Sequence, residues 1–409
     1  MNSTARHASD FDPLGDEVNQ CPYPYYARLR AEAPVFKVPS GEFYIASTAD
    51  VVQEIFRHPD LFSNNIYGNI IQTPELKAVY MVVPTLSQSD PPQHTPLRKI
   101  VERFFTPARI NAMEPAIRAL ADELIDDFID RGKADFTSDF AVPLTIMVLA
   151  DTLGVDRAIR QRFKLWSTTY LMVPQRVFSP EQEREAAGII HEANGYLLEL
   201  FRERRSAPRD DVISVLATAE MEDENGRHPV PEDQFVTVMQ QLVSGGNETT
   251  AGTVTAGLLQ LLRHPELIAR LRHEPGFVDA FVEETLRFES PIQGLWRRVV
   301  SATTLAGVSL PAGAIVNIRL GSANRDDGKF QHAQEFDPAR RENSQHLAFG
   351  LGVHLCVGRM LARKELKCAY AAVAARLDDL ALAPGAELSY RRAFLERSLK
   401  SLPVTFRKR

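Results

Sequence analysis

The stretch FGLGVHLCVGRMLAR, residues 349–363, places the lone Cys356 among glycines at positions 350, 352 and 358. A cysteine binds a metal as the thiolate, so its free pKa of about 8.5 must be lowered by the metal, by positive charge or by donated hydrogen bonds. Glycines let backbone N–H groups approach a sulfur or a flat cofactor without obstruction by side chains. A dinucleotide-binding glycine motif does not fit, because Leu355 stands where its third glycine belongs. The stretch therefore predicts a thiolate site.

The composition narrows the class of protein. The 409 residues are 44% hydrophobic and 24% charged, which is typical of a globular protein with a large core. The net charge of −6 argues against nucleic acid as the main partner. Cys21, Cys356 and Cys368 form no CxxC pair, and a reducing compartment fits them best.

No membrane segment is expected. The N-terminal MNSTARHASDFDPLGDE lacks the apolar region of a secretory signal. The most apolar window, Phe140–Ala150, is shorter than the roughly 20 residues of a membrane helix and contains Pro143. We expect a buried core helix there and a cytoplasmic protein.

Helical periodicity dominates the middle of the chain and β patterns flank it. Helices are predicted at Pro107–Arg131, Val142–Leu153, Glu181–Arg205 and Asp210–Ala219, with a last one from Val357. Val35–Ser47 predicts two strands, and Val299–Leu320 predicts a hairpin that turns at Pro311–Gly313. Residues 1–20 are expected to form a loosely ordered arm. The pattern predicts a mainly α protein with small β-sheets.

The longest predicted helix, Pro231–His264, has an unusual middle. Its ends are well specified, with a proline at the first position and acidic residues in the first turn. Gly245, Gly246 and Asn247 are poor helix formers, and each glycine costs about 1 kcal/mol relative to alanine. The weak middle indicates either close packing or a helix that opens to seat a ligand, and this segment alone favours close packing.

Several motifs together resemble one family. The signature FGxGxHxCxG of the haem-thiolate monooxygenases, the cytochromes P-450, is matched by Phe349, Gly350, Gly352, His354, Cys356 and Gly358. The family's ExxR motif resembles Glu284–Arg287, completed by Arg340, and its central-helix motif resembles Gly245–Thr249. The DPPxHTxLR segment is similar to Asp90–Arg98, and the resemblance extends from about residue 20 to the C-terminal LPVTF. It implies the soluble bacterial type of this superfamily, with one domain over residues 21–409.

The resemblance implies haem b (iron protoporphyrin IX) between the long central helix and the cysteine loop. Cys356 would be the iron ligand, and its thiolate would favour O–O cleavage. Glu248 and Thr249 would form the acid and alcohol pair that delivers protons, and the neighbouring glycines would then leave room for dioxygen. The residues implied to contact the haem are His94, Arg98, Arg297, Phe349, Gly350, His354 and Gly358. Arg298 is an alternative to Arg297, and Glu284, Arg287 and Arg340 would form a buried structural network.

A redox partner follows from the same resemblance, with reducing equivalents from NAD(P)H. Basic residues share one face of the last helix: Arg359, Arg363, Lys364 and Lys367. They indicate either an ordinary solvated face or a docking patch for an acidic ferredoxin or flavodoxin.

The family's substrate-contacting segments are mostly apolar in this chain. The pocket residues they imply are Ile66, Ile70, Leu86, Val243, Ser244, Gly245, Gln293, Leu295 and Phe394. These predict a small-to-medium hydrophobic substrate that is hydroxylated or oxidatively demethylated. A terpenoid, an aromatic acid, a steroid and a macrolide all remain open. Alternative functions are a peroxide-driven peroxygenase and a non-catalytic haem sensor or carrier.

Overall fold

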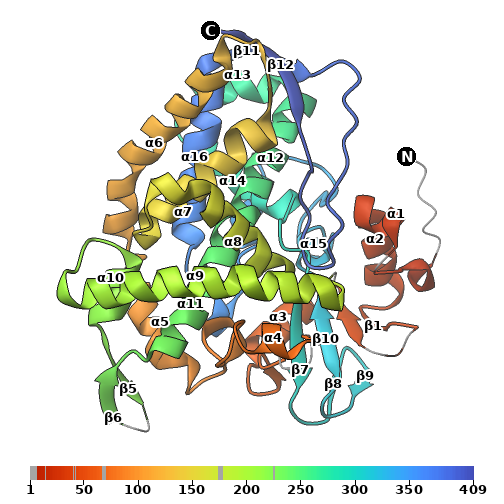
Figure 1. Ribbon diagram of the computed structural model, residues 1–409. Helices are drawn as coiled ribbons and strands as arrows, with labels where there is room; N and C mark the ends of the chain where they lie inside the picture. The colour runs from red at the N-terminus through yellow and green to blue at the C-terminus, as the bar shows by residue number, and fades with distance from the viewer. Residues whose placement is uncertain are drawn as a thin grey trace.

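The structure, a computed structural model, describes residues 7–13, 15–39, 41, 43–66, 71–173, 178–223 and 226–409. It is mainly helical, with small sheets at the periphery of the helical body: β7–β10 lie at its lower right, β11 and β12 at its top, and β5 and β6 at its lower left (Figure 1). This is the architecture that the sequence predicts. The helices are α1 (Asp16–Gln20), α2 (Tyr23–Glu32), α3 (Ala49–Arg57), α4 (Pro74–Lys77), α5 (His94–Glu102), α6 (Pro107–Ile129), α7 (Val142–Leu153), α8 (Arg160–Met172), α9 (Pro180–Ser206), α10 (Val212–Thr218), α11 (Glu232–Gly246), α12 (Glu248–Arg263), α13 (Glu266–His273), α14 (Phe277–Phe288), α15 (Leu320–Ala323) and α16 (Arg359–Arg376).

The predicted long helix is observed as α11 and α12, which meet at Asn247. The backbone there departs from helical geometry, with φ −99° and ψ −74°. The Asn247 side chain bonds outward: its Oδ1 accepts from the Thr145 hydroxyl of α7 at 2.8 Å, and its Nδ2 donates to Ser167 Oγ of α8 at 3.3 Å. The weak middle of the helix is thus a real break, held by neighbouring helices.

The largest sheet has the strand order β1-β2-β10-β7-β3. Its β7 and β10 are antiparallel, with Arg297 opposite Val316 and Trp296 opposite Asn317. A second sheet has the order β11-β12-β4. The strands are β1 (Val35–Lys37), β2 (Tyr44–Ala46), β3 (Phe62–Ser63), β4 (Lys133–Asp135), β5 (Glu220–Asp223), β6 (Gly226–Pro229), β7 (Leu295–Val299), β8 (Thr303–Leu305), β9 (Val308–Leu310), β10 (Ile315–Ile318), β11 (Leu377–Leu382) and β12 (Pro403–Lys408).

The hairpin predicted to turn at Pro311–Gly313 turns elsewhere. The tight turn is at Ala306 and Gly307, which both have positive φ, and it joins β8 to β9. The turn at Pro311–Gly313 instead leads from β9 into β10, which pairs with β2 and β7. The prediction was wrong because both turns carry glycine, and only the strand pairing decides which one closes the hairpin.

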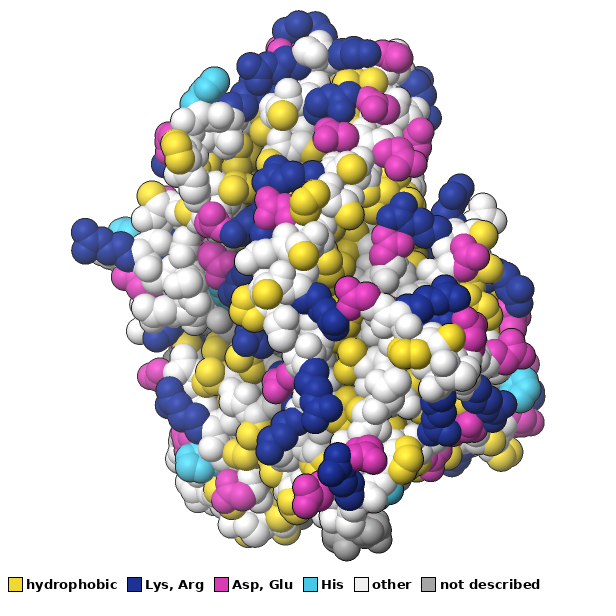
Figure 2. Space-filling view, turned by 90° about the vertical axis from the view of Figure 1, so that its left-hand side faces the viewer, with side chains coloured by type: hydrophobic (Ala, Val, Ile, Leu, Met, Phe, Trp, Pro, Cys, Tyr) yellow, Lys and Arg dark blue, Asp and Glu magenta, His cyan; other side chains and the backbone are white. Residues whose placement is uncertain are grey.

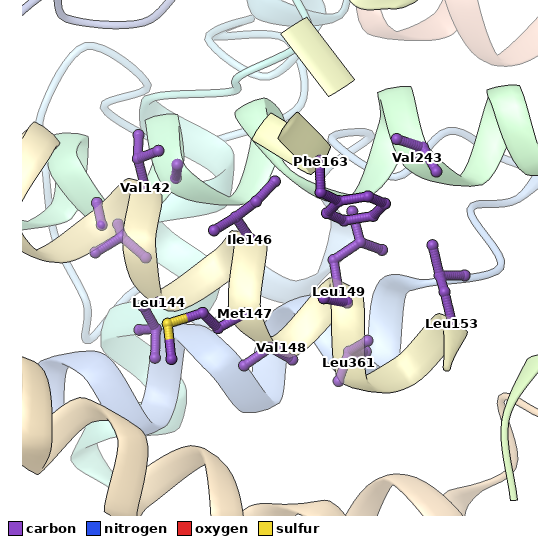
Figure 3. Close-up of a cluster of buried hydrophobic side chains, with 14 of the residues drawn as sticks. Val142, Leu144, Ile146, Met147, Val148, Leu149, Leu153, Phe163, Val243 and Leu361 are labelled. Atoms are coloured by element: carbon purple, nitrogen blue, oxygen red, sulfur yellow. The ribbon is translucent and has the colours of Figure 1, made fainter. Parts of the chain in front are cut away.

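The apolar window of the sequence forms a core helix. Helix α7 packs its side chains against α8, α11 and α16, where Figure 3 shows them clustered with Phe163, Val243 and Leu361. By length and composition the stretch Phe136–Leu153 could cross a membrane, but 72% of it is buried inside the molecule. Burial of this extent is what a core helix requires.

The N-terminal arm is a correction to the sequence prediction. Residues 7–13 and 15–20 are not loosely ordered, because Ala8, Phe11 and Val18 are buried in a cluster with residues of α2. The Phe11 ring lies 5.9 Å from that of Tyr26. These apolar side chains are spaced too widely to give a helical pattern in the sequence, but they pack against α2 in the folded protein. Residues 1–6 and 14 lie outside the described residues.

Candidate active site

Cys356 lies in a loop immediately before α16 and lines a cavity. Its N–H donates to the Phe349 carbonyl at 2.9 Å. Burial raises the pKa of the thiol, whereas the Gly358 N–H and the nearby guanidinium groups of Arg98 and Arg359 favour the thiolate. Because burial dominates, the thiolate needs a further cation at the sulfur, which a bound metal supplies.

Two glycines and one arginine shape this loop. Gly350 and Gly352 adopt φ values of 71° and 73°, which disfavour other residues. A Cβ on Gly352 would lie 2.9 Å from the Phe56 carbonyl oxygen of α3, so the loop approaches that helix closely. Arg98 donates from Nη2 to the Leu355 carbonyl at 2.6 Å and thereby anchors the loop to α5.

A mostly apolar cavity separates the cysteine loop and α16 from the central helices α11 and α12. Cys356 and Thr249 both line it. The other predicted site residues on its wall are Gly245, Leu295, Arg297, Phe349, Gly350, His354 and Gly358. The structure therefore brings the cysteine loop and the weak middle of the central helix to the same space, which is where the resemblance places the cofactor.

His94 and His354 lie side by side next to this space, with ring centres 4.5 Å apart. Within the described part of the chain, Nε2 of each ring is buried without a hydrogen-bond partner. His354 Nε2 lies 3.8 Å from Asp90 Oδ1. Burial, the neighbouring His354 and Arg98 lower the pKa of His94 to about 4, and burial also lowers that of His354. Among the described residues His94 Nε2 has no acceptor, and His354 Nε2 has only the Asp90 carboxylate beyond hydrogen-bond distance, so both neutral rings can donate to a further acceptor at the cavity.

Strand β7 decides between the two candidate arginines. Arg297 is buried and lines the cavity, and its Nη1 donates to the Trp296 carbonyl at 2.7 Å. Arg298 is exposed, because successive side chains of a strand point to opposite faces.

These groups fit the haem that the resemblance implies. Haem carries two carboxylates that need cationic or hydrogen-bonding partners at a buried site, and Arg297, His94 and His354 offer such groups at the cavity. The described residues contain no cluster of three or more His, Cys, Asp or Glu that could hold a metal. The mostly apolar cavity beside Cys356 has the lining that a flat, largely hydrophobic group such as haem would require.

The predicted structural network is assembled beneath the site. Glu284 accepts from Arg287 Nη2 at 2.7 Å and from Nε at 2.8 Å, and Arg340 Nε lies 3.5 Å from the same carboxylate. Arg287 also donates to the carbonyls of Asn324 and Ala333. All three charged side chains are buried, so each depends on the others for compensation.

Glu248 lies beside the cavity and does not form part of its wall. It is buried at the start of α12, and its Oε1 accepts from the Thr168 hydroxyl of α8 at 3.2 Å. The Thr249 hydroxyl donates to the Gly245 carbonyl at 2.7 Å. Adjacent residues of a helix point about 100° apart, so the two side chains face different directions.

Other residues predicted for the substrate pocket also lie off the cavity wall. Val243 packs with Phe163 in the core (Figure 3). The Ser244 hydroxyl donates to the Gln241 carbonyl, and Gln293 bonds to Tyr26 and Ser290. Ile66 and Leu86 do not line the cavity, and Ile70 lies outside the described residues.

Phe394 lies one layer behind the wall. Its ring stacks on Trp296, with centres 5.0 Å apart, and Trp296 itself lines the cavity. The sequence missed Trp296 because its register in β7 was not fixed.

Helix periodicity could have found more of the wall. Gln241, Leu242, Gly245, Gly246, Thr249, Thr250 and Thr253 all line the cavity. They recur at three- and four-residue spacing and so share one face of the central helices. Glu365 also lines the cavity, and its only signal was an acidic residue within a basic helix; burial raises its pKa well above the usual value.

The predicted basic patch on α16 is largely paired. Arg363 binds Glu283, Lys364 binds Glu114 and Lys367 binds Asp279. Arg359 donates to the Cys356 carbonyl at 3.1 Å. Cationic and acidic side chains are similarly interspersed on the face shown in Figure 2.

Comparison with known proteins agrees with this geometry. The family model Cytochrome P450 matches residues 25–377. The chain is 34% identical to Cytochrome P450 monooxygenase PikC of Streptomyces venezuelae, over 98% of this chain and 94% of that protein. It is 35% identical to Vitamin D(3) 25-hydroxylase of Pseudonocardia autotrophica, over 94% of each. The structure of CYP109E1 from Bacillus megaterium in complex with testosterone superposes with a TM-score of 0.84 at 30% identity, covering 96% of this chain and 99% of that one.

Proposed function

The chain belongs to the cytochrome P450 family and is a haem-dependent monooxygenase of the bacterial type, and we propose that Cys356 binds the haem iron while Thr249 serves the opposite side. One observation carries this assignment: the half-buried Cys356 and Thr249 line the same mostly apolar cavity from opposite elements. The buried Nε2 atoms of His94 and His354, together with Arg297, supply partners for the haem carboxylates.

When bound, the haem supplies the oxygen-activating chemistry, and the chain supplies ligation, proton handling and exclusion of water. Thr249 Oγ1 gives its hydrogen to the Gly245 carbonyl, so its lone pairs face the cavity as an acceptor. Glu248 is the nearest acid in sequence, but its carboxyl bonds to Thr168. We propose that a rotation of Glu248, or a water between the two groups, completes the proton path.

Electrons come, in this proposal, from NAD(P)H through a ferredoxin or flavodoxin that docks over the cysteine loop. Arg359 is its main contact, because Arg363, Lys364 and Lys367 already bind acidic side chains. The half-exposed Val353 of the same loop adds an apolar contact. A cytoplasmic location fits a partner of this kind.

The substrate is proposed to be a hydrophobic molecule of small to medium size that is hydroxylated or oxidatively demethylated. The cavity walls around Thr249 carry Leu149, Leu242, Ile292 and Trp296, with Gln241 and Thr250 as polar groups for orientation. One relative is named as a vitamin D3 hydroxylase and one solved relative holds testosterone, and both favour the steroid class among the candidate substrates.

The ferrous–carbon monoxide spectrum tests the ligand assignment. A thiolate gives a red-shifted Soret band, and Cys356→Ser should abolish it while the protein stays folded. Retention of the band in Cys356→Ser would overturn the assignment.

A screen of steroids, terpenoids, macrolides and aromatic acids for the spin-state shift of the ferric haem then identifies the substrate class. Turnover with NADH, ferredoxin and reductase, compared with hydrogen peroxide alone, separates a monooxygenase from a peroxygenase.

A further inference from the structure

Arg363 is held by two partners within the protein, a carboxylate and an aromatic ring. Its Nε and Nη2 donate to the two oxygens of Glu283 on α14, at 2.6 and 2.8 Å. Its guanidinium carbon lies 4.6 Å from the centre of the Phe349 ring. A two-point ion pair combined with a stacked ring fixes the plane of a guanidinium, which a flexible docking residue does not need.

His346 closes the same arrangement. Its Nδ1 accepts from the Ala348 N–H at 3.1 Å, so the neutral ring carries its hydrogen on Nε2. That Nε2 lies 3.4 Å from Glu283 Oε2, and the ring lies 5.8 Å from Phe349. Burial raises the pKa of Glu283, but the hydrogen bonds from Arg363 and the nearby His346 ring outweigh it and bring the pKa to about 2. Glu283 is therefore ionised across the physiological range.

Phe349 transmits this arrangement to the cysteine. Its carbonyl accepts the Cys356 N–H at 2.9 Å, and its ring lines the cavity. A shift of the Phe349 ring therefore moves the backbone that positions the sulfur. The path from Glu283 to Cys356 contains one ion pair, one ring contact and one backbone hydrogen bond.

We propose that Arg363 is a positioning residue of the haem-thiolate site, which Glu283 and His346 hold against Phe349 so that the Cys356 loop keeps the geometry that sets the iron's reduction potential. The inference rests on the proposed ligation by Cys356. It replaces the docking role that the basic spacing of α16 predicted for Arg363. Removing the cation while Glu283 stays ionised leaves a net negative charge behind the Phe349 ring and the cysteine loop, which would disfavour the added electron.

The test uses the haem-loaded protein without any redox partner. Arg363→Met should shift the reduction potential to more negative values, and the fraction of ferrous–carbon monoxide protein lacking the thiolate band should rise roughly fivefold. Arg363→Lys keeps the positive charge but not the planar stacking on Phe349. Its reduction potential should therefore be close to that of the wild type, while the fraction of protein lacking the thiolate band should stay nearly as high as in Arg363→Met. The double variant Glu283→Gln with Arg363→Met removes both charges and guards against a single variant that fails to fold. In the double variant the potential should return towards the wild-type value while the band defect persists.

Arg376 provides a matched control on the same helix. Its side chain is 29% exposed, as is that of Arg363, and it binds Asp122 and Asp126 of α6 away from the loop. Arg376→Met should leave the potential and the spectrum unchanged. The proposal is overturned if the Arg363 variants match Arg376→Met in both readouts. A wild-type protein without the thiolate band would instead refute the ligation by Cys356, so the two failures are distinguishable.

Discussion

The elements behind the proximal wall of the cavity, below Cys356, are fixed by directional polar contacts, whereas the distal wall, around Thr249, combines a few hydroxyl and amide groups with apolar packing. Below, Glu284, Arg287 and Arg340 form a buried network, and Arg98 clamps the loop. Above, Leu149, Leu242 and Ile292 contribute contact area without fixed geometry. Hydrogen bonds fix angles and distances, but apolar contact only rewards burial. The difference suits a ligand atom that must be placed within a fraction of an ångström and a substrate that must be allowed to vary.

The largest expected effect breaks the proximal wall. Glu284→Gln removes the carboxylate that compensates two buried arginines, so it should lower the free energy of unfolding by about 3–5 kcal/mol. Urea denaturation of the haem-loaded protein measures this loss. The exposed pair Arg270–Glu274 is the control, and Glu274→Gln should cost less than about 1 kcal/mol. Equal losses in the two variants would mean that the buried network contributes no more to stability than an exposed ion pair does.

A change in the distal wall should affect chemistry and leave stability nearly intact. Thr249→Ala removes the hydroxyl that faces the cavity, so most electrons should be lost as hydrogen peroxide while haem and substrate still bind. Peroxide and product formed per NADH consumed are measured together. Thr253→Ala, one helical turn further along the same wall, is the control and should couple as the wild type does. Unchanged coupling in Thr249→Ala would remove it from the proton path.

A smaller effect is expected on the proximal surface, where charges are exposed. Arg359→Gln and Lys367→Gln each remove one positive charge, but Lys367 is held by Asp279. Arg359→Gln should slow reduction by ferredoxin a few-fold at low salt, and more than Lys367→Gln does, because among the basic residues of the predicted patch on α16 the described residues give no acidic partner to Arg359. Stopped-flow reduction at several salt concentrations measures both rates. Equal slowing would indicate long-range attraction without a specific contact at Arg359.

The smallest effect concerns a charge conflict on the distal side. Burial and the carboxylate of Glu248 raise the pKa of Glu396 to about 8. The folded protein then keeps this proton up to about pH 8, whereas the unfolded chain releases it near pH 4.5. The resulting stability is fully present below pH 4.5 and is lost as the pH rises towards 8.

Glu396→Gln should flatten this pH dependence. The difference in melting temperature between Glu396→Gln and the wild type should be a few degrees more favourable to the variant at pH 8.5 than at pH 5.5. The proximal Glu283→Gln should show no such gain at high pH, because the pKa of Glu283 is lowered instead. A parallel pH profile for Glu396→Gln and the wild type would contradict the assigned conflict.

The sequence predicted elements well where the pattern was local. Helix α7 begins and ends where apolar periodicity placed it, and the break in the central helix lies at Asn247, directly after the glycines. The family assignment followed from residues 349–358 because their spacing is nearly unique. The hairpin turn was misplaced because strand pairing is a tertiary property. The packed N-terminal segment was missed because Phe11 and Val18 are buried by residues of a separate helix, such as Tyr26, and by Ile45 of a strand, which no helical or strand periodicity links to them.

Site residues divide in the same way. Those on the cysteine loop were found, since the motif itself specifies them. Val243 and Phe394 belong to segments that approach the cavity, but which of their faces points inward depends on packing. The spacing on α16 showed that Arg363 shares a helix face with Arg359. It could not show that Glu283 of α14 forms an ion pair with Arg363, because that contact depends on how the two helices pack.

The carboxamide of Asn247 joins three helices at one point. Because it bonds to Thr145 and Ser167 at once, any displacement of α8 pulls on the backbone just before Thr249. Binding of a bulky substrate that displaces α8 would then also change the position of the Thr249 hydroxyl that takes part in proton delivery. Substitutions at Thr145 or Ser167, which touch neither substrate nor cofactor, should therefore alter substrate binding and proton delivery together.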